Sequence, residues 1–296
     1  MQNKKCGFVS IIGMPNAGKS TLLNFLVKEK ISIVSPKVQT TRREVRGIIE
    51  HNNSQIIFVD TPGICRPNTP LEKVLLSNFK KSCKCSDITL LLIDCLDKNI
   101  ESNLKFLQNK KQVQDNFIVA INKIDLMKNK SQLLPIIDKL KDYNFINQIF
   151  LISATTGEGI DHILLYLSEN VPNGPWLYFE DHEVTDLDLK TRLSEITREK
   201  LYNNLEKELP YNIYVTTDRL HVTDKKFKVL QTIVVMKDSQ KGIVLGHKGS
   251  MIRQIKHEVV NDIKNIFNKT VELNITVKVK EKWTQRKDQL INAGIL

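Results

Sequence analysis

Apolar runs alternate with amphipathic stretches along roughly the first 170 residues of the chain. Five runs are apolar enough to indicate buried strands, at 6–12, 54–60, 87–95, 116–121 and 148–152. Helices are expected between them, at about 19–28, 70–82, 100–111, 131–142 and 159–169, and the alternating segment 45–50 suits an edge strand. Strands that alternate with helices favour right-handed crossovers, so the pattern predicts an α/β fold with a doubly wound, mostly parallel sheet.

The remainder of the chain has a different pattern, which begins after "VPNGPW" and an acidic stretch. A helix is expected at 189–207, followed by two strand-like segments, two helices separated by glycines and a last strand. This order predicts a small α+β domain. The predicted limits are 1–173 for the first domain, 174–200 for a linker and connecting helix, and 201–296 for the second domain.

Composition bounds the class of protein. Hydrophobic residues make up 41% of the 296 residues, which is enough for real cores and disfavours disorder. The longest apolar run, "ITLLLIDCL", is interrupted by Asp94 and is far shorter than the roughly 20 residues that span a bilayer. Five cysteines without paired metal spacing indicate reduced thiols in a cytosolic protein, and Cys83 and Cys85 are expected at ordinary helix positions.

Positive charge is concentrated near the end of the chain. The net charge is +11, and residues 209–296 carry 16 basic against 8 acidic side chains. Such a segment favours a polyanionic partner, with nucleic acid as the leading candidate. The alternative is compositional drift in a chain that is rich in Lys, Asn and Ile.

The segment "GMPNAGKS", Gly13 to Ser20, follows a predicted strand and precedes a predicted helix. It matches the pattern G-x-x-x-x-G-K-[ST], whose glycines let backbone amides approach phosphates closely. Lys19 would supply positive charge to the β- and γ-phosphates, and the Ser20 hydroxyl would bind Mg²⁺. The predicted phosphate site comprises Gly13, Met14, Pro15, Asn16, Ala17, Gly18, Lys19, Ser20 and Thr21.

A second motif, "DTPG", ends the strand expected at 54–60. Asp60 would hold Mg²⁺ through water, and the N–H of Gly63 would reach the γ-phosphate. The residue after this motif is Ile64, where the best-studied GTPases carry a water-orienting glutamine just beyond the turn. The predicted contacts of this segment are Asp60, Thr61, Pro62, Gly63 and Ile64.

The motif "NKID" follows the strand at 116–121 and predicts the base. Guanine offers two neighbouring donors that the Asp125 carboxylate can accept together, whereas adenine offers no such pair. Asn122 would tie this loop to the phosphate segment, and the stem of Lys123 would lie across the base. The predicted base contacts are Asn122, Lys123, Ile124, Asp125, Ser153 and Ala154, and the predicted nucleotide is GTP or GDP.

The segment "SPKVQTTRREVRG" lies between the first helix and the edge strand. A threonine here would reach Mg²⁺ only when the γ-phosphate is bound. Thr41 is the first candidate and Thr40 the second, and two solvated loop threonines are the alternative interpretation. The predicted metal ligands are therefore Ser20, Thr41 and Asp60, and the groups expected to act in catalysis are Lys19, Thr41 and Gly63.

Together, "GMPNAGKSTLLNFL", "QTTRR", "DTPGI", "NKID" and "ISAT" resemble the Era branch of the translation-associated GTPases. That family carries a hydrophobic residue where the glutamine would stand, so Ile64 fits its pattern. In related GTPases an asparagine at the place of Asn16 helps to bind K⁺ near the phosphates. The resemblance therefore implies slow, Mg²⁺-dependent GTP hydrolysis without a glutamine, with K⁺ as a candidate second cation.

The second domain resembles a type II KH domain, because its order α-β-β-α-α-β places "GHKG" at the turn between two helices. A G-x-x-G loop clamps the backbone of single-stranded RNA, and a plain helix C-cap is the alternative for the glycines. The RNA contacts that the resemblance implies are Lys241, Gly246, His247, Lys248, Gly249, Arg253 and Lys256.

The resemblance covers nearly the whole chain. It implies a monomeric cytoplasmic protein that binds small-subunit ribosomal RNA near its 3′ end and assists maturation of the small ribosomal subunit, with peripheral association with the cytoplasmic face of the membrane. Two other classes share part of this pattern, a signalling GTPase with a lipid- or protein-binding basic tail and a GTP-gated ion transporter. The folded pattern of the tail argues against the first, and the lack of a spanning segment argues against the second.

Overall fold

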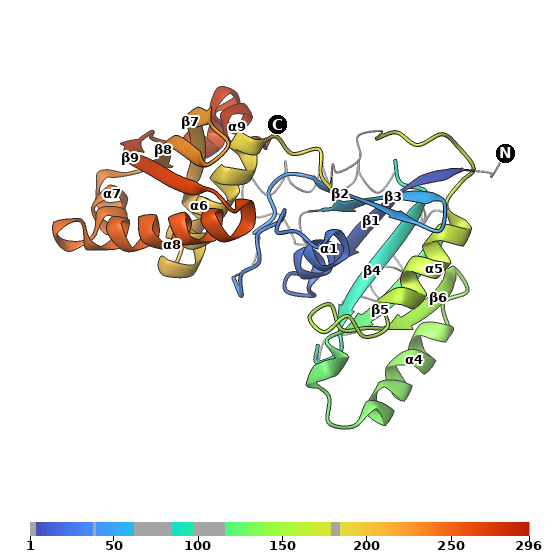
Figure 1. Ribbon diagram of the computed structural model, residues 1–296. Helices are drawn as coiled ribbons and strands as arrows, with labels where there is room; N and C mark the ends of the chain where they lie inside the picture. Colours follow the sequence, from blue (N-terminus) through green and yellow to red (C-terminus); the bar gives the residue numbers. More distant parts are fainter. Residues whose placement is uncertain (1–3, 38–39, 62–84, 98–115, 179–183, 296) are drawn as a thin grey trace. The chain divides into compact units, whose positions relative to one another are not determined.

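The computed structural model describes residues 4–37, 40–61, 85–97, 116–178 and 184–295, and the helices expected at 70–82 and 100–111 lie outside them (Figure 1). Two compact units are present. Within the described residues, the first unit takes in the chain up to Ser32 and from Arg43 to Asp186. The second takes in the segment Ile33–Arg42 and the chain from Leu187 onward.

A six-stranded sheet in the order β2-β3-β1-β4-β5-β6 forms the centre of the first unit. Its strands are β1 (Lys5–Gly13), β2 (Val45–His51), β3 (Ser54–Asp60), β4 (Ile88–Asp94), β5 (Phe117–Asn122) and β6 (Ile146–Leu151). Only β2, at the edge, is antiparallel to its neighbour, and the other pairings are parallel. The α/β class predicted from the alternating pattern is therefore confirmed.

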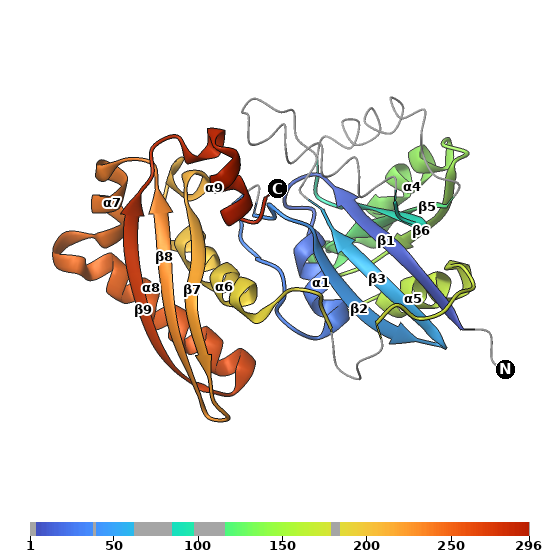
Figure 2. The ribbon, with the colours of Figure 1, turned by 90° about the horizontal axis from the view of Figure 1, so that it is seen from above.

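Helices cover both faces of this sheet. Figure 2 shows α1 (Lys19–Val27) and α5 (Ile160–Asn170) on one face and α4 (Leu134–Lys141) on the other. The helix expected from residue 131 begins later, because residues 130–133 form a 3₁₀ turn and Pro135 occupies the first turn of α4. Since the parallel strands end at one edge of the sheet, the loops that follow β1, β3 and β5 share that edge.

The second unit has the predicted order of elements. It consists of α6 (Leu189–Asn204), β7 (Tyr214–Val222), β8 (Lys226–Val235), α7 (Asp238–Leu245), α8 (Ser250–Phe267), β9 (Thr270–Val279) and α9 (Lys287–Asn292). Strand β8 is central, antiparallel to β7 and parallel to β9. The α+β arrangement of this domain is confirmed.

The core of the second unit lies between its sheet and the helices α6, α7 and α8. Ile255, Val259 and Ile263 recur every four residues on α8 and are fully buried, as an amphipathic helix requires. A smaller cluster, which includes Tyr214 and Trp283, joins β7 to the segment after β9, with ring centroids 4.7 Å apart. Burial raises the pKa of Tyr214 to about 12, and its hydroxyl donates to Oε1 of Gln289 at 2.7 Å.

Arg42 is buried inside the second unit, although the sequence places it in a polar loop. Its Nη1 donates to the carbonyl of Ile213 at 2.6 Å. Its Nη2 lies 2.7 Å from the carbonyl of Tyr211, 3.1 Å from that of Pro210 and 2.9 Å from the hydroxyl of Tyr202. Burial lowers the pKa of Arg42, but a guanidinium stays charged in proteins. Several donors on one planar group therefore satisfy a cluster of backbone acceptors.

Two further cations hold the same segment. Arg198 of α6 donates to the carbonyl of Thr40 at 2.5 Å and forms an ion pair with Glu195 at 2.6 Å. Burial lowers the pKa of Arg198, but the Glu195 carboxylate and the Tyr202 hydroxyl together outweigh burial, so the pKa is raised overall. The ammonium of Lys37 donates to two carbonyls at the end of α6. The segment 33–42 is thus anchored to the second unit by three basic side chains.

Arg42→Ala should lower the free energy of unfolding of the second unit by at least about 2 kcal/mol, because each buried carbonyl that is left without its donor costs roughly 1–3 kcal/mol. Arg42→Lys should restore little of this, since an ammonium cannot reproduce the guanidinium fork. Urea titration followed by Trp283 fluorescence, in a Trp176→Phe background, reports this unit.

The matched control is Arg286→Ala, which removes an exposed arginine whose nearest carboxylate contact is 3.5 Å long. Equal urea midpoints for the Arg42→Ala and Arg286→Ala proteins would refute an anchoring role for Arg42.

Candidate functional site

The loop between β1 and α1 has the backbone geometry of an anion site. Gly18 has a φ of 99°, and a Cβ there would lie 2.3 Å from the side-chain nitrogen of Asn122. A Cβ on Gly13 would lie 2.4 Å from a backbone oxygen, so both positions require glycine. Within the described residues no side chain caps the N-terminus of α1. Its first amides can therefore serve an anion.

Lys19 is the first residue of α1 and is 7% exposed. Its ammonium donates to the carbonyls of Gly13 at 3.0 Å and Met14 at 3.1 Å. Burial lowers the pKa of Lys19, while the Asp60 carboxylate opposes this shift. A bound polyanion would further favour the charged form, which suits Lys19 to a phosphate partner.

Ser20 and Asp60 lie together and fit a magnesium ion. The Ser20 hydroxyl donates to Asp60 Oδ2 at 2.7 Å, and Asp60 is fully buried at the end of β3. Because the serine proton goes to the carboxylate, the lone pairs of the serine oxygen are available to a cation. Mg²⁺ prefers a few such oxygen ligands together with water and substrate phosphates. This donor set therefore matches the predicted metal.

The other predicted residues of the phosphate-switch region are placed only in part. Thr61 is buried, and its hydroxyl donates to the carbonyl of Ile11 at 2.9 Å, which fixes the end of β3 against β1. Pro62, Gly63 and Ile64 lie outside the described residues.

Thr41 lies in the segment 33–42, which belongs to the second unit. The side chain of Thr41 is 7% exposed, and the neighbouring Thr40 and Arg42 both bond to that unit. The role of Thr41 as a metal ligand, with Thr40 as the second candidate, stays a prediction.

Asn122 connects two loops at the edge of the first sheet. It is 1% exposed at the end of β5, and its side-chain NH₂ donates to the carbonyl of Ala17 at 2.8 Å. Its side-chain oxygen accepts from the N–H of Ala154 at 2.9 Å. The tie between the base-reading loop and the phosphate loop, expected from the sequence, is present. The Ala154 amide is engaged in this tie, so the predicted contact of Ala154 with the base stays a prediction, and a contact through the amide would require an exchange of partners.

Lys123 and Asp125 flank the place expected for the base. The Lys123 ammonium lies 2.5 Å from Asp94 Oδ2, and the Lys123 backbone is left-handed, with a φ of 68°. Asp125 is exposed in the 3₁₀ turn Ile124–Leu126, while the side chain of Ile124 is buried and anchors the turn. The carboxylate of Asp125 therefore stands where a ligand can reach it.

The remaining predicted residues of the nucleotide site differ in exposure. Asn16 is exposed and left-handed, with a φ of 64°, a conformation that asparagine tolerates better than most residues. The half-buried members are Met14, Pro15 and Thr21, and the buried ones are Ala17 and Ser153.

The turn between α7 and α8 places "GHKG" at the surface of the second unit. Gly246 has a φ of 73°, and a Cβ on it would lie 2.7 Å from the backbone nitrogen of Met251. The amide of Gly246 also bonds to the carbonyl of Gly242 at 2.9 Å, so this glycine ends α7 as well as opening the turn. His247 and Lys248 are exposed. The turn can therefore bring backbone amides and cations to a phosphate chain.

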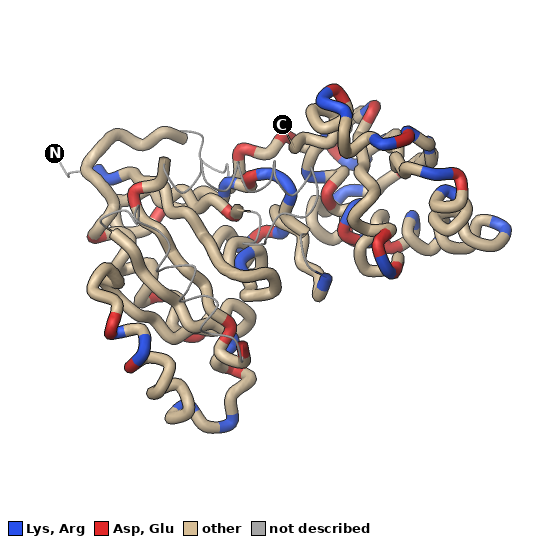
Figure 3. The backbone as a smooth tube through the Cα atoms, turned by 180° about the vertical axis from the view of Figure 1, so that it is seen from behind, with Lys and Arg blue, Asp and Glu red and all other residues tan. Residues whose placement is uncertain are grey.

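Basic side chains surround this turn, but basic residues are not confined to it and acidic residues lie among them. Arg253 and Lys256 are exposed on α8 and Lys241 is half-buried on α7. Figure 3 shows basic positions spread over the second unit, with acidic positions among them. The glycine turn, rather than a broad basic face, distinguishes the candidate interface.

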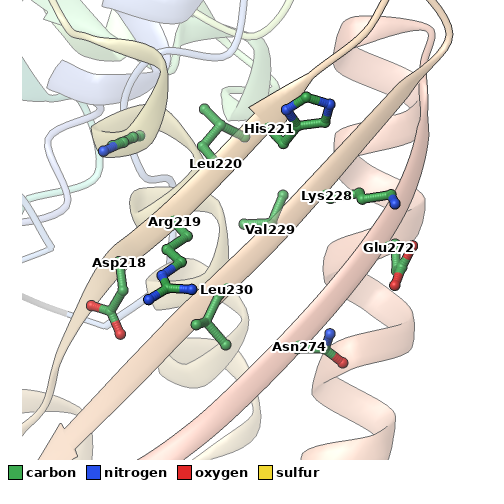
Figure 4. A pocket seen from close by; sticks show the side chains of 10 residues that line it. Asp218, Arg219, Leu220, His221, Lys228, Val229, Leu230, Glu272 and Asn274 are labelled. Carbon is green, nitrogen blue, oxygen red and sulfur yellow. The ribbon is translucent and has the colours of Figure 1, made fainter.

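A separate groove of about 540 Å³ lies on the three-stranded sheet (Figure 4). Its walls carry both signs of charge, with Arg219 and Lys228 beside Asp218 and Glu272. Glu272 is paired with Lys226 at 2.8 Å. Mixed charge does not favour a polyanion, so the groove is a weaker candidate for nucleic acid than the glycine turn.

Two side chains at the nucleotide site do not follow from the sequence motifs. Asp94, which holds Lys123, ends the buried strand β4, and a carboxylate at the end of a parallel strand was a usable signal. Ser32 donates to Asp60 Oδ2 at 3.0 Å and follows no motif.

Comparisons with known proteins agree with both units. The model of the 50S ribosome-binding GTPase family matches residues 8–123, and the KH domain model matches residues 201–284. GTPase Era of Mesorhizobium japonicum is 42% identical over 291 residues, which cover 98% of this chain and 93% of that protein. GTPase Era of Ehrlichia ruminantium strain Gardel is 39% identical and covers 97% of each chain.

Two solved structures are similar over almost the whole chain. Aquifex aeolicus Era, as a variant bound to GDP.AlF4-, has a TM-score of 0.87 and 34% identity and covers 98% of this chain and 99% of its own. Era in complex with MgGDPNP and nucleotides 1506–1542 of 16S ribosomal RNA also has a TM-score of 0.87 and 34% identity, and covers 99% of both chains.

Proposed function

Because the chain belongs to the Era family of GTPases, we propose that it is a GTP-hydrolysing switch that binds small-subunit ribosomal RNA near its 3′ end and assists maturation of the small ribosomal subunit. The main support is the Era structure that holds MgGDPNP and a 16S ribosomal RNA segment at once, since this chain matches it over both units. GTPase activity itself follows from family membership.

The residues of the first unit account for nucleotide binding in this proposal. The amides at the start of α1 and the Lys19 ammonium would hold the phosphates, and Ser20 and Asp60 would hold Mg²⁺. The bound Mg²⁺ would neutralise charge that develops on the phosphates during hydrolysis. Asp125 selects guanine, while Asn122 and the ion pair between Lys123 and Asp94 keep the base-reading loop in place.

Asp125→Asn should exchange guanine for xanthine as the preferred base. The oxygen of the variant's side-chain amide would accept a hydrogen bond from the xanthine ring N–H, and its NH₂ would donate to the xanthine carbonyl. In guanine the exocyclic NH₂ takes the place of that carbonyl, so two donor groups would face each other. We expect GTP affinity to fall by a factor of about 10 to 100, on the order of one charge-assisted hydrogen bond. Competition with a fluorescent GDP analogue measures both affinities.

The control is Asp138→Asn, which changes a carboxylate of α4 that is exposed beside Lys141. It should bind both nucleotides as the parent does. Unchanged GTP affinity in the Asp125→Asn protein would refute the assignment of guanine recognition to Asp125.

We also propose that K⁺ assists hydrolysis beside Asn16. Hydrolysis should be faster in K⁺ than in Na⁺, because a cation near the phosphates would supply charge that an arginine gives in other GTPases. Asn16→Gly should abolish the difference, since glycine keeps the left-handed backbone and removes the amide. Single-turnover hydrolysis in the two salts measures this, and equal rates in the parent protein would exclude the cation.

RNA binding is assigned to the turn at 246–249. Replacing His247 and Lys248 with Asp puts two carboxylates against the phosphate backbone, so affinity for a small-subunit RNA fragment should fall by a factor of ten or more. The dependence of log affinity on log salt should weaken by about 0.7 for each phosphate that the protein no longer neutralises. GTP affinity should stay unchanged because Lys19 and Asp125 belong to the other unit.

A matched pair controls for net charge in this experiment. Lys248→Asp changes the turn, and Lys264→Asp makes the same change at an exposed position near the far end of α8. Equal decreases of RNA affinity in the two proteins would show that total charge, and not the turn, determines binding.

The family resemblance supports two finer proposals, that the protein is monomeric and cytoplasmic and that it associates peripherally with the cytoplasmic face of the membrane. In the part of the chain that the structure describes, no helix combines the length and the apolar character needed to cross a bilayer. Sedimentation measures whether the protein is a monomer, and flotation with lipid vesicles measures whether it associates with a membrane.

A further inference from the structure

The buried carboxylate of Asp60 receives a hydroxyl that belongs to none of the nucleotide-binding motifs. Ser32 Oγ donates to Asp60 Oδ2 at 3.0 Å, and the same oxygen accepts from Ser20 Oγ at 2.7 Å. Asp60 is 0% exposed and Ser32 is 5% exposed, so this contact is shielded from solvent. All three residues lie in the first unit.

Ser32 is held in place by Asn24 of α1. The side-chain oxygen of Asn24 accepts from the backbone amides of Ile31 and Ser32, each at 2.9 Å. The side-chain NH₂ of Asn24 donates to the carbonyl of Ser32 at 2.9 Å. Asn24 lies one turn beyond Ser20 on the same helix, so a single rigid element positions both hydroxyls that reach Asp60.

We infer that Ser32 is a positioning residue for Mg²⁺ binding. The Ser32 hydroxyl fixes the orientation of the Asp60 carboxylate, which in turn holds the metal. This inference rests on the proposed metal site at Ser20 and Asp60. Two donors on one carboxylate oxygen restrict rotation of the group, and Mg²⁺ demands nearly ideal octahedral geometry. Partners that orient a metal-binding carboxylate commonly change metal affinity by about 10- to 100-fold when they are removed.

The role inferred for Ser32 differs from that of a metal ligand. Ser32 is 5% exposed and lies outside the phosphate loop that carries Ser20, and its hydroxyl bonds to the Asp60 carboxylate, so Ser32 acts through that carboxylate. Removal of the hydroxyl should weaken Mg²⁺ binding without removing any contact to the nucleotide. This separates Ser32 from Lys19, whose removal would weaken binding of the nucleotide itself.

The test uses the full-length protein loaded with a fluorescent GDP analogue. Its release is followed over a range of free Mg²⁺ and in excess EDTA. For Ser32→Ala, the Mg²⁺ concentration that gives half-maximal slowing of release should rise about tenfold. Release in EDTA should match the parent protein, and Ser32→Thr, which keeps a hydroxyl, should restore most of the Mg²⁺ response.

Ser54→Ala is the matched control. Ser54 is also buried, begins the strand that Asp60 ends, and donates to the carbonyl of Ser168 at 2.9 Å. The substitution removes one buried serine hydrogen bond from the same strand, so its Mg²⁺ midpoint should equal that of the parent.

Three results would overturn the inference. A Ser32→Ala midpoint within twofold of the parent would show that the hydroxyl is dispensable. Equal shifts in Ser32→Ala and Ser54→Ala, or faster release of Ser32→Ala in EDTA as well, would reduce Ser32 to general support of the fold. If release from the parent protein ignores Mg²⁺, the metal site itself fails, and this is seen without any variant.

Discussion

The two hydrogen bonds of the Asn122 side chain hold the nucleotide site together. The loops after β1, β5 and β6 lie far apart along the chain, yet phosphate and base must be recognised at a fixed spacing. Asn122 donates to Ala17 and accepts from Ala154, both at under 3 Å, in a site that is almost fully buried. The close approach explains Gly18 as well, since any Cβ there would collide with the asparagine amide. The glycine at position 18 of the phosphate loop is therefore required by the close contact with Asn122 in the base-reading loop.

Much of this site was accessible from the sequence because its determinants are local. The run "SQIIFVD" predicts a strand that is buried on both faces, and every residue of β3 is buried. The alternation in "VRGIIE" predicts an edge, and β2 is the antiparallel edge strand. Spacing within "GMPNAGKS" and "GHKG" predicts turns before helices, and α1 begins at Lys19 within the first motif while α8 begins at Ser250 directly after the second. In each case the physical signal is complete within about ten residues.

The missing parts depend on contacts between residues far apart in sequence. Arg42, in "QTTRR", resembles a solvated loop cation, and its burial is explained by distant acceptors such as the carbonyls of Tyr211 and Ile213. Ser32 belongs to no motif, and its role becomes visible only from its hydrogen bonds with Asn24 and Asp60. Local pattern does not encode such pairings, because the favourable energy arises only when folding brings the two partners together.

Helix N-termini preceded by a glycine in the left-handed region occur at both candidate sites, and burial makes them chemically different. Gly18 (φ 99°) precedes α1 and Gly249 (φ 76°) precedes α8, and neither helix start has a side-chain cap within the described residues. Both present backbone amides to an anion. At α1 the adjoining Lys19 and Asp60 are buried, so electrostatic interactions there are strong, weakly screened by salt and selective for one bound geometry.

At α8 the neighbouring His247 and Lys248 are exposed, so each phosphate contact is screened by salt and tolerant of sequence. The same backbone device thus suits a compact nucleotide in one unit and an extended polyanion in the other. The difference arises from the depth at which the surrounding charges are buried, and not from the glycines themselves.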